Sequence, residues 1–228
     1  MAHHIVSFSG GKDSTAMLLN MVDKGYRIDE VLFVDTTKEF PGMYEHIEKV
    51  EQYIGMPITR LKISFDYYFS EHVKTKGKNK GEKGYGFPLS NGRWCSALKR
   101  DTVAAYLQKF DSIVDYRGIA VDEAHRCERN GKSRFEVRYP LVEWGMTEDE
   151  CLQDCYARGF DWAGLYKDFG RVSCWCCPLS RIGELRTLYR KYPELWARLL
   201  EMDNLNKRYF KNKYTVHDLD AKFKREGI

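Results

Sequence analysis

The chain has 228 residues, enough to bury a substantial core as one large domain or as one domain with a small appendage. Hydrophobic residues make up 43% of it and charged residues 31%, which is ordinary for a soluble globular protein, and a net charge of +4 does not by itself indicate a nucleic-acid partner. No apolar run is long enough to span a bilayer, and the first residues lack the basic and apolar regions of a signal peptide. We therefore expect a cytoplasmic protein with no membrane partner.

The first part of the chain alternates predicted strands and helices. Apolar runs predict buried strands over 4–9, 30–37 and 58–63, and the apolar periodicity between them predicts helices over 13–25 and 45–55. Strands that alternate with helices in this way form parallel sheets with helical crossovers. We expect an α/β fold with an open, mostly parallel twisted sheet and helices on both faces.

The middle of the chain continues this pattern. A helix is predicted over 95–110 and a strand over 111–120. Thr147 and Glu150 have the spacing of a capping box, which predicts a short helix that begins there and ends near Gly159.

The C-terminal segment is predicted to be helical from Glu184 onward, with Pro193 breaking a helix or starting one. No internal repeat and no long linker separates parts of the chain. We expect one α/β domain over 1–181 and a helical C-terminal extension over 182–228.

Two stretches are locally basic, with glycine or tyrosine interleaved. They are Val73–Gly86 and Asn206–Tyr214. Either stretch has the composition of a phosphate-contacting surface, and either also fits a solvated loop or an exposed helix face.

A glycine pair separates the first predicted strand from the first predicted helix. Backbone N–H groups of Gly10 and Gly11 can converge there on an anion, and the positive end of the helix dipole adds to the attraction. Lys12 follows directly with a full positive charge, and hydroxyl groups surround the turn. The hydroxyls come from Ser7, Ser9, Ser14 and Thr15. The pattern predicts a phosphate site; the alternative is a tight turn that merely requires glycine.

The segment SGGKDS resembles the PP-loop of ATP pyrophosphatases. Four further segments resemble those of phosphoadenosine phosphosulfate (PAPS) reductases and their ATP-using relatives, in family order. They are FVDTTKEFPGMYEHIEKV, RWCSALKRDTV, YRGIAVDEAHRC and YPLVEWGMTEDECLQDCYARG. Together these motifs reach from about Ile5 to about Arg181, and they imply an adenine nucleotide alpha hydrolase-like fold.

This resemblance implies a nucleotide site at the carboxyl ends of the strands. The residues expected to contact ATP or its Mg²⁺ are Ser7, Ser9, Gly10, Gly11, Lys12, Asp13, Ser14, Asp35, Thr36, Gly118 and Asp122. Lys99 and Arg126 are expected to face phosphate or a sulfated group, although each taken alone fits a surface ion pair. Asp13 either helps to place Mg²⁺ or caps the helix. We expect Lys12, Asp13, Lys99 and Arg126 to be the catalytic residues.

The chain contains seven cysteines, and in a cytoplasmic protein they do not indicate a disulfide framework. Cys174, Cys176 and Cys177 crowd into one short segment, and crowding of this kind indicates metal or redox chemistry. Pro178 follows the last of them, as in many cluster-binding loops.

The resemblance adds Cys95 to the metal ligands Cys174 and Cys177. Cys95 lies where cluster-containing sulfonucleotide reductases carry a cysteine pair, but here Trp94 replaces the first cysteine. Candidates for a fourth ligand are Cys155 and Cys176, followed by Cys127 and Cys151. Three ligands and one open iron of a 4Fe-4S cluster are a further possibility, zinc is the competing metal, and buried inert thiols are the third interpretation.

The catalytic tail cysteine of PAPS reductases has no counterpart here, since no cysteine follows Cys177. We therefore expect an ATP pyrophosphatase that adenylates an acceptor for sulfur insertion, most similar to the ATP pyrophosphatase subunit of bacterial DNA phosphorothioation systems. That resemblance implies a nucleic-acid acceptor, a cysteine desulfurase as sulfur donor and a possible homodimer. The alternatives are a PAPS or adenosine phosphosulfate reductase that releases sulfite, and a nucleotide-binding regulator without turnover.

Overall fold

The computed structural model describes residues 1–128, 134–172, 174–206, 208–211 and 213–227. The chain divides into two compact units, each assembled from separate segments. Unit 1 comprises Met1–Asp35, Pro41–Lys62 and Asp101–Tyr166, and unit 2 comprises Thr36–Phe40, Ile63–Arg100 and Lys167–Ile228. In the part of the chain that is described, no helix is both long and apolar enough to cross a membrane.

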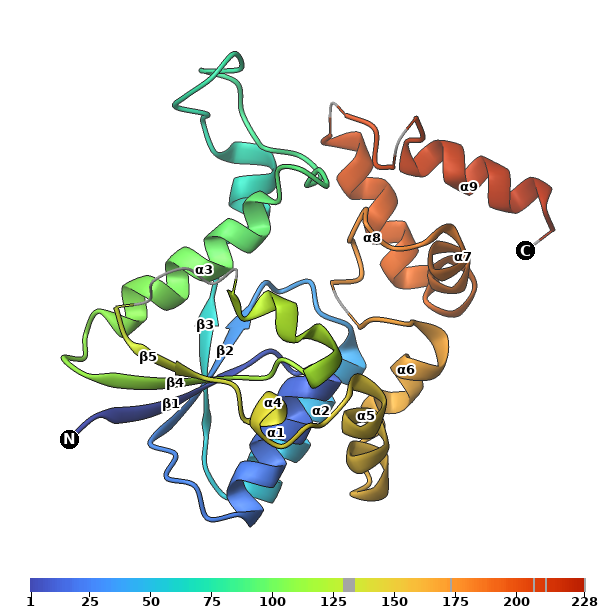
Figure 1. Cartoon of the computed structure of the whole chain (residues 1–228). Helices are drawn as coiled ribbons and strands as arrows, with labels where there is room; N and C mark the ends of the chain where they lie inside the picture. Colours follow the sequence, from blue (N-terminus) through green and yellow to red (C-terminus); the bar gives the residue numbers. More distant parts are fainter. Residues whose placement is uncertain (129–133, 173, 207, 212, 228) are drawn as a thin grey trace. The chain divides into compact units, whose positions relative to one another are not determined.

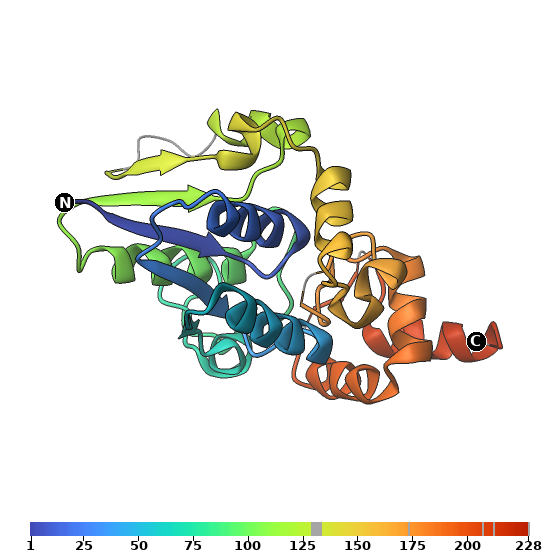
Figure 2. The same cartoon turned by 90° about the horizontal axis from the view of Figure 1, so that it is seen from below.

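Unit 1 is built on an open five-stranded sheet (Figure 1). Its strands are β1 (His3–Phe8), β2 (Glu30–Asp35), β3 (Ile58–Lys62), β4 (Ile113–Arg117) and β5 (Glu136–Arg138). The order across the sheet is β3-β2-β1-β4-β5, and all neighbouring pairs are parallel, as Figure 2 shows for the central strands. The α/β fold with a parallel open sheet is therefore confirmed.

The central strands form because their apolar residues are buried on both faces of the sheet. In β1, Ile5 and Val6 point to opposite faces and both are fully buried. Ile5 packs with Leu107 and Ile113 in the core on one face of the sheet. The edge strand β5 was not predicted, because its three residues EVR carry no apolar alternation.

Helices cover both faces of the sheet, as predicted. The second half of α3 (Trp94–Leu107) packs on the face that bears Ile5, whereas α1 (Lys12–Asp23) and α2 (Pro41–Ile54) lie on the other face (Figure 1). Helix α2 starts four residues earlier than the predicted 45, because Pro41 has the fixed φ that suits the first turn of a helix. 

The rest of unit 1 consists of short helices. Helix α4 is Pro140–Glu143 and α5 is Glu148–Ala157, and α5 packs along α1. The predicted capping box is present, since the Thr147 hydroxyl accepts from the backbone N–H of Glu150 and the Glu150 carboxylate accepts from that of Thr147. Short 3-10 turns occupy Val121–Arg126 and Trp162–Gly164, and α6 is Leu165–Asp168.

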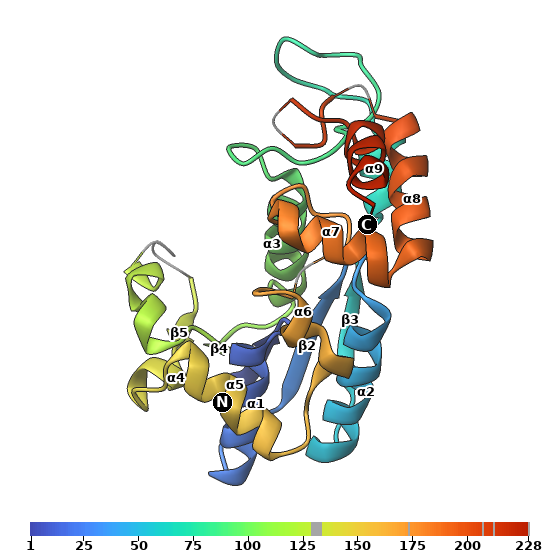
Figure 3. The same cartoon turned by 90° about the vertical axis from the view of Figure 1, so that its right-hand side faces the viewer.

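Unit 2 contains the C-terminal helices α7 (Ile182–Lys191), α8 (Pro193–Asn204) and α9 (Val216–Arg225), which pack on one another (Figure 3). Pro193 starts α8. The buried carboxylate of Asp203 accepts a hydrogen bond from the backbone N–H of Val216 at 2.8 Å, and this contact ties the end of α8 to the start of α9.

The segment 63–100 also belongs to unit 2. This segment contains one π-helical turn, Tyr67–Glu71. The ring of Phe87, also in this segment, packs edge-on against the ring of Phe210, and the ring centroids are 4.7 Å apart. Aromatic side chains of 63–100 therefore pack with the C-terminal segment inside unit 2, and the domain boundary at 181 stays a prediction.

The structure describes the first basic stretch in full and the second in part. Val73 and Lys83 form an antiparallel bridge, and Lys74 pairs with Glu82 at 3.0 Å, so Val73–Gly86 folds back on itself. In Asn206–Tyr214, Lys207 and Asn212 lie outside the described residues.

Candidate nucleotide site and cysteine cluster

The glycine pair forms the turn between β1 and α1. Gly10 has φ +77°, and a Cβ at this position would lie 2.5 Å from the Sδ of Met43, so both the backbone conformation and the space require glycine. Gly11 is the N-cap residue of α1 and supplies no side-chain cap. The first N–H groups of α1 consequently have no partner from the N-cap side chain, as an anion site requires.

Side chains from elsewhere in unit 1 hold this turn. The indole Nε1 of Trp162 donates to the carbonyl oxygen of Gly10 at 2.7 Å, and the backbone N–H of Lys12 donates to the hydroxyl of Tyr166 at 2.8 Å. Within the turn, the Ser14 hydroxyl accepts from the backbone N–H of Ser9 at 3.1 Å and lies 2.9 Å from the Ser9 hydroxyl. The loop is therefore preorganised by hydrogen bonds to its backbone.

A buried imidazole lies beneath the turn. His46 is 2% exposed, its Nε2 lies 3.0 Å from the Thr15 hydroxyl, and its ring stacks on Trp162 with centroids 4.3 Å apart. Burial, with a smaller contribution from Lys49, lowers the pKa of His46 to about 3. His46 is therefore a neutral packing element of the site.

Lys12 is held by two carboxylates. Its Nζ donates to Asp13 at 3.0 Å and also to the carboxylate of Glu148. Burial acts to lower the pKa of Lys12, but the hydrogen bonds to Glu148 and Asp13 outweigh it and the pKa is raised. Burial also raises the pKa of Asp13, against the opposing effect of Lys12. The Lys12 ammonium thus lies between two carboxylates, which accept its hydrogen bonds.

Two residues predicted at the nucleotide line the same turn from other elements. Gly118 follows β4, and a Cβ there would lie 2.7 Å from the Cα of Ser14, so the backbone after β4 approaches the first turn of α1 closely. Asp122 accepts from the backbone N–H of Glu148 at 3.2 Å and thereby positions the start of α5, which carries the carboxylate that pairs with Lys12.

Other predicted residues of unit 1 have structural partners. Ser7 donates to Asp115 at 2.7 Å within the sheet, and the buried Asp35 accepts from the hydroxyl of Tyr44 at 2.8 Å. The exposed Arg126 pairs with Glu123 three residues earlier. Their expected roles in nucleotide binding stay predictions.

In unit 2, Thr36 and Lys99 meet at a buried carboxylate. Glu39 is 8% exposed and accepts from the Thr36 hydroxyl at 2.9 Å, from the Cys174 thiol at 3.7 Å and from the Lys99 ammonium at 3.4 Å. Burial, with a further contribution from Glu39, raises the pKa of Cys174 to about 12. Burial acts to lower the pKa of Lys99, but Glu39 and Cys174 outweigh it and the pKa is raised.

Two further thiols, those of Cys176 and Cys177, lie close to the Cys174 thiol. Burial raises the pKa of Cys176 well above its usual value, and the neighbouring Cys174 and Cys177 raise it further. Burial also raises the pKa of Cys95, and the next largest contribution comes from Cys177. Cys95 is therefore close enough to Cys177 to feel its charge, and its role as a metal ligand stays a prediction.

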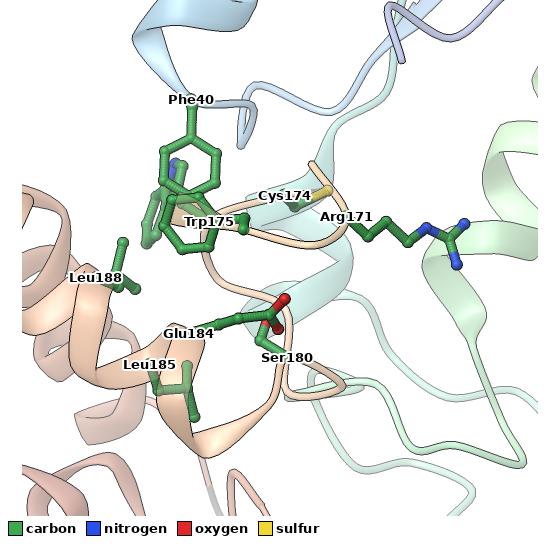
Figure 4. Close-up of a pocket in the computed structure, with 9 residues that line it drawn as sticks. Phe40, Arg171, Cys174, Trp175, Ser180, Glu184, Leu185 and Leu188 are labelled. Carbon is green, nitrogen blue, oxygen red and sulfur yellow. The ribbon is translucent and has the colours of Figure 1, made fainter. Parts of the chain in front are cut away.

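The backbone of the cysteine segment is anchored to residues 36–40. The backbone N–H of Trp175 donates to the carbonyl oxygen of Lys38 at 3.0 Å, and the buried Lys38 ammonium lies 5.8 Å from the centroid of the Trp175 ring. Figure 4 shows Cys174 and Trp175 on this loop, beside a small cavity that Phe40 and Leu188 also line.

The cysteine thiols of this segment are the kind of ligand that zinc and iron-sulfur clusters take. Cys95, Cys174, Cys176 and Cys177 all belong to unit 2, with the cations Lys38 and Lys99 near them to offset thiolate charge. Within the described residues, however, no three His, Cys, Asp or Glu side chains already converge at metal-binding geometry.

Cys155 and Cys151 are placed elsewhere. Both lie in α5 of unit 1 and are fully buried, and the Cys155 thiol donates to the backbone carbonyl oxygen of Lys12 at 3.7 Å. Burial raises the pKa of both thiols, that of Cys151 to about 12. The ligand role of Cys155 stays a prediction, and in the structure its thiol contacts the backbone at the start of α1.

Sequence reasoning missed Glu148, Tyr166, Trp162 and Glu39. Glu148 had one signal, because it follows the N-cap Thr147 of a predicted capping box and so begins a helix near the site. No local signal pointed to Tyr166 or Trp162. Tyr166 lies 154 positions from Lys12, which it contacts, and Trp162 lies 152 positions from Gly10.

A family model for the phosphoadenosine phosphosulfate reductase domain matches residues 3–180. Two uncharacterized proteins of Methanocaldococcus jannaschii are 29% and 26% identical over 85% and 86% of the chain, which spans only 40% and 46% of their lengths. An uncharacterized 37.8 kDa protein of Escherichia phage 186 is 24% identical over 89% of the chain and 75% of its own length. Among solved structures, the U34-tRNA thiolase NcsA of Methanococcus maripaludis, determined with its [4Fe-4S] cluster, matches with a TM-score of 0.46 and 14% identity over 99% of this chain and 71% of its own.

Proposed function

Because the chain belongs to the phosphoadenosine phosphosulfate reductase domain family, we propose that it is an ATP pyrophosphatase that adenylates an acceptor for sulfur insertion. The observation that carries this proposal is the turn at Gly10 and Gly11, where a helix begins without a side-chain cap from its N-cap residue and Lys12 adds a positive charge in the first turn. Helix N-termini of this kind bind phosphate groups.

In the proposed first step, an oxygen of the acceptor attacks the α-phosphorus of Mg-ATP. The bond from the α-phosphorus to the bridging oxygen breaks, and pyrophosphate leaves. Negative charge grows on the leaving pyrophosphate, and the backbone N–H groups of the turn together with Lys12 stabilise it. Lys12 must then exchange Glu148 for a phosphate oxygen, and Asp13 is a candidate ligand for the Mg²⁺ ion.

In the second step, sulfur at the sulfide level replaces the adenylated oxygen, and AMP leaves with that oxygen. When bound, an iron-sulfur cluster held by Cys95, Cys174 and Cys177, with Cys176 or Cys155 as a fourth ligand or an open iron, would supply an iron able to hold sulfide, and zinc is the alternative metal. A cysteine desulfurase would deliver the sulfur as a persulfide, a thiol reductant would reduce that persulfide to sulfide, and the acceptor would be a nucleic acid.

A second candidate function is reduction of PAPS or adenosine phosphosulfate to sulfite. The family description favours it, since the matched model is named for the reductase domain. In that case Lys99 would face the sulfate, and a thiol would attack sulfur in place of an acceptor attacking phosphorus.

The test uses anaerobically purified protein incubated separately with Mg-ATP and candidate acceptors, and with PAPS and a thiol reductant. Pyrophosphate is measured in the first reaction and sulfite in the second. Release of pyrophosphate that is abolished in Lys12→Ala and retained in Lys49→Ala, an exposed lysine of unit 1, supports the proposal. Release of sulfite from PAPS supports the second candidate function. If neither pyrophosphate nor sulfite is formed, the result supports a nucleotide-binding regulator without turnover.

A further inference from the structure

Unit 2 carries an open hollow of about 440 Å³ at the start of α3. Arginines from two segments line it, Arg93 and Arg100 from 93–100 and Arg208 from the segment after α8. The other lining residues are apolar or glycine apart from the Tyr85 hydroxyl, and no carboxylate is among the described residues that line the hollow. It is therefore cationic at its rim and largely apolar within.

The guanidinium groups of the three arginines form no ion pair with a described residue. No described carboxylate lies within ion-pair distance of Arg93, Arg100 or Arg208, whereas Arg60, elsewhere in the chain, pairs with Glu51. An unpaired guanidinium retains its donors for a phosphate, which it can bind in a bidentate manner.

The two arginines at the start of α3 lie on one face. The carbonyl oxygen of Arg93 accepts from the backbone N–H of Ala97 at 3.1 Å, so Arg93 opens the helix and Arg100 follows two turns later. Seven residues of helix rise about 10.5 Å, which separates two cations along the rim. Ala97 lies between them, and its small side chain leaves this face open.

The apolar part of the hollow is largely aromatic, and contacts within unit 2 hold its rings. The indole Nε1 of Trp94 donates to the carbonyl oxygen of Gly86 at 3.0 Å, and its ring lies 5.7 Å from that of Tyr85 at an interplanar angle of 30°. Phe87 is 1% exposed beneath them. Rings held in this way are platforms on which planar groups stack at a small entropic cost.

We propose that this hollow binds a single-stranded segment of nucleic acid, with bases stacked on the Tyr85 and Trp94 rings and phosphates paired with the arginines. This inference rests on the proposed function in identifying the bound strand as the acceptor. Unpaired guanidiniums beside aromatic rings match a strand with free base faces, and duplex nucleic acid keeps those faces stacked inside. An acidic peptide would satisfy the arginines but would leave the aromatic surface uncovered.

The test is fluorescence anisotropy of the whole chain with labelled single-stranded RNA, single-stranded DNA and duplex DNA, without ATP, over a range of salt concentrations. Arg93→Ala, Arg100→Ala and Arg208→Ala should each weaken single-strand binding about five- to tenfold and reduce the slope of log K against log salt by about one. Ala97→Glu should weaken it further. Arg190→Ala, an exposed arginine on α7 outside the hollow, is the matched control and should bind like the wild type.

Equal binding by all variants, or a preference for duplex, would overturn the inference. The RNA and DNA arms identify which strand is the ligand. Because binding is measured without ATP, weaker strand binding by Arg100→Ala with an unchanged Kd for pyrophosphate would separate this hollow from the turn at Gly10 and Gly11. Strand binding by a protein that releases no pyrophosphate would instead contradict the proposed function and leave the binding site in place.

Discussion

The ammonium of Lys12 donates a hydrogen bond to the carboxylate of Glu148, a residue 136 positions away in the chain. Glu148 is the first residue of α5, and Asp122 accepts from its backbone N–H. The turn at Gly10 and Gly11 is therefore coupled to a helix that begins far away in the sequence, and under the proposed function the Glu148 carboxylate would compete with phosphate for the Lys12 ammonium.

Removing the charge of Glu148 should strengthen phosphate binding. In Glu148→Gln the amide no longer competes for Lys12 as an anion, so we expect the Kd for pyrophosphate without Mg²⁺ to fall about fivefold, which corresponds to roughly 1 kcal/mol. Isothermal titration calorimetry measures the change, with Asp149→Asn, the exposed next residue, as control. Weaker binding by Glu148→Gln would show that the ion pair positions Lys12.

Gly10→Ala should destabilise unit 1 more than Gly25→Ala does. Both glycines have positive φ, +77° and +67°, but a Cβ meets Met43 at 2.5 Å only at Gly10, and nothing lies within 4 Å of one at Gly25. We expect a loss of about 1 kcal/mol for Gly25→Ala from backbone strain and about 2–4 kcal/mol for Gly10→Ala, where overpacking adds to it. Urea unfolding measures both, and equal losses would contradict the close approach of Met43.

Trp162→Phe tests the hydrogen bond that holds the loop. The variant keeps an aromatic ring near His46 but loses the N–H that donates to the Gly10 carbonyl oxygen, and we expect a loss of about 1–2 kcal/mol in the free energy of unfolding. The KM for ATP should rise as the loop loses its anchor. Trp144→Phe, for which no indole hydrogen bond is found among the described residues, is the control. No difference between the two variants would remove Trp162 from the support of the loop.

His46 should make the protein less stable in acid. Burial lowers the pKa of His46 from 6.5 to about 3, so below about pH 6.5 the unfolded chain binds a proton that the folded chain does not. This group alone should cost about 1.4 kcal/mol of stability for each pH unit from about 6.5 down to about 3. Urea unfolding at several pH values in this window should show that the free energy of unfolding depends less steeply on pH in His46→Gln than in the wild type. An unchanged slope would mean that His46 is protonated in the folded state.

Metal content should separate the candidate ligands. After anaerobic reconstitution, Cys95→Ser, Cys174→Ser and Cys177→Ser should lose most of the bound iron and labile sulfide, or zinc, because thiolates are the preferred ligands of these metals. Cys127→Ser, in unit 1, is expected to retain the metal, and loss of metal in this variant would instead identify Cys127 as the fourth ligand. Loss in Cys176→Ser with retention in Cys155→Ser would identify Cys176 as the fourth ligand, and the reverse result would identify Cys155. Full metal content in all variants would leave the cysteines as structural thiols.

Local patterns explain why most of the fold was predictable. The apolar runs of β1, β2 and β4 specify buried parallel strands, and the Thr147–Glu150 spacing specifies the start of α5, because each signal is complete within a few residues. The strand β5 lacks such a signal. Its three residues EVR contain one apolar side chain between two charged ones, and they join the sheet by pairing with the edge of β4.

By itself the sequence determined the parallel sheet, the glycine turn that carries Lys12, and the cysteines available to a metal, because backbone conformation and donor chemistry are properties of neighbouring residues. Only the tertiary structure decided which side chains complete each site. Trp162 and Glu148 reach the loop from distant segments, Glu39 joins Cys174 to Lys99, and Cys155 is buried against the backbone of Lys12. Such contacts depend on how helices pack against the sheet, and packing is a collective property that no short motif encodes.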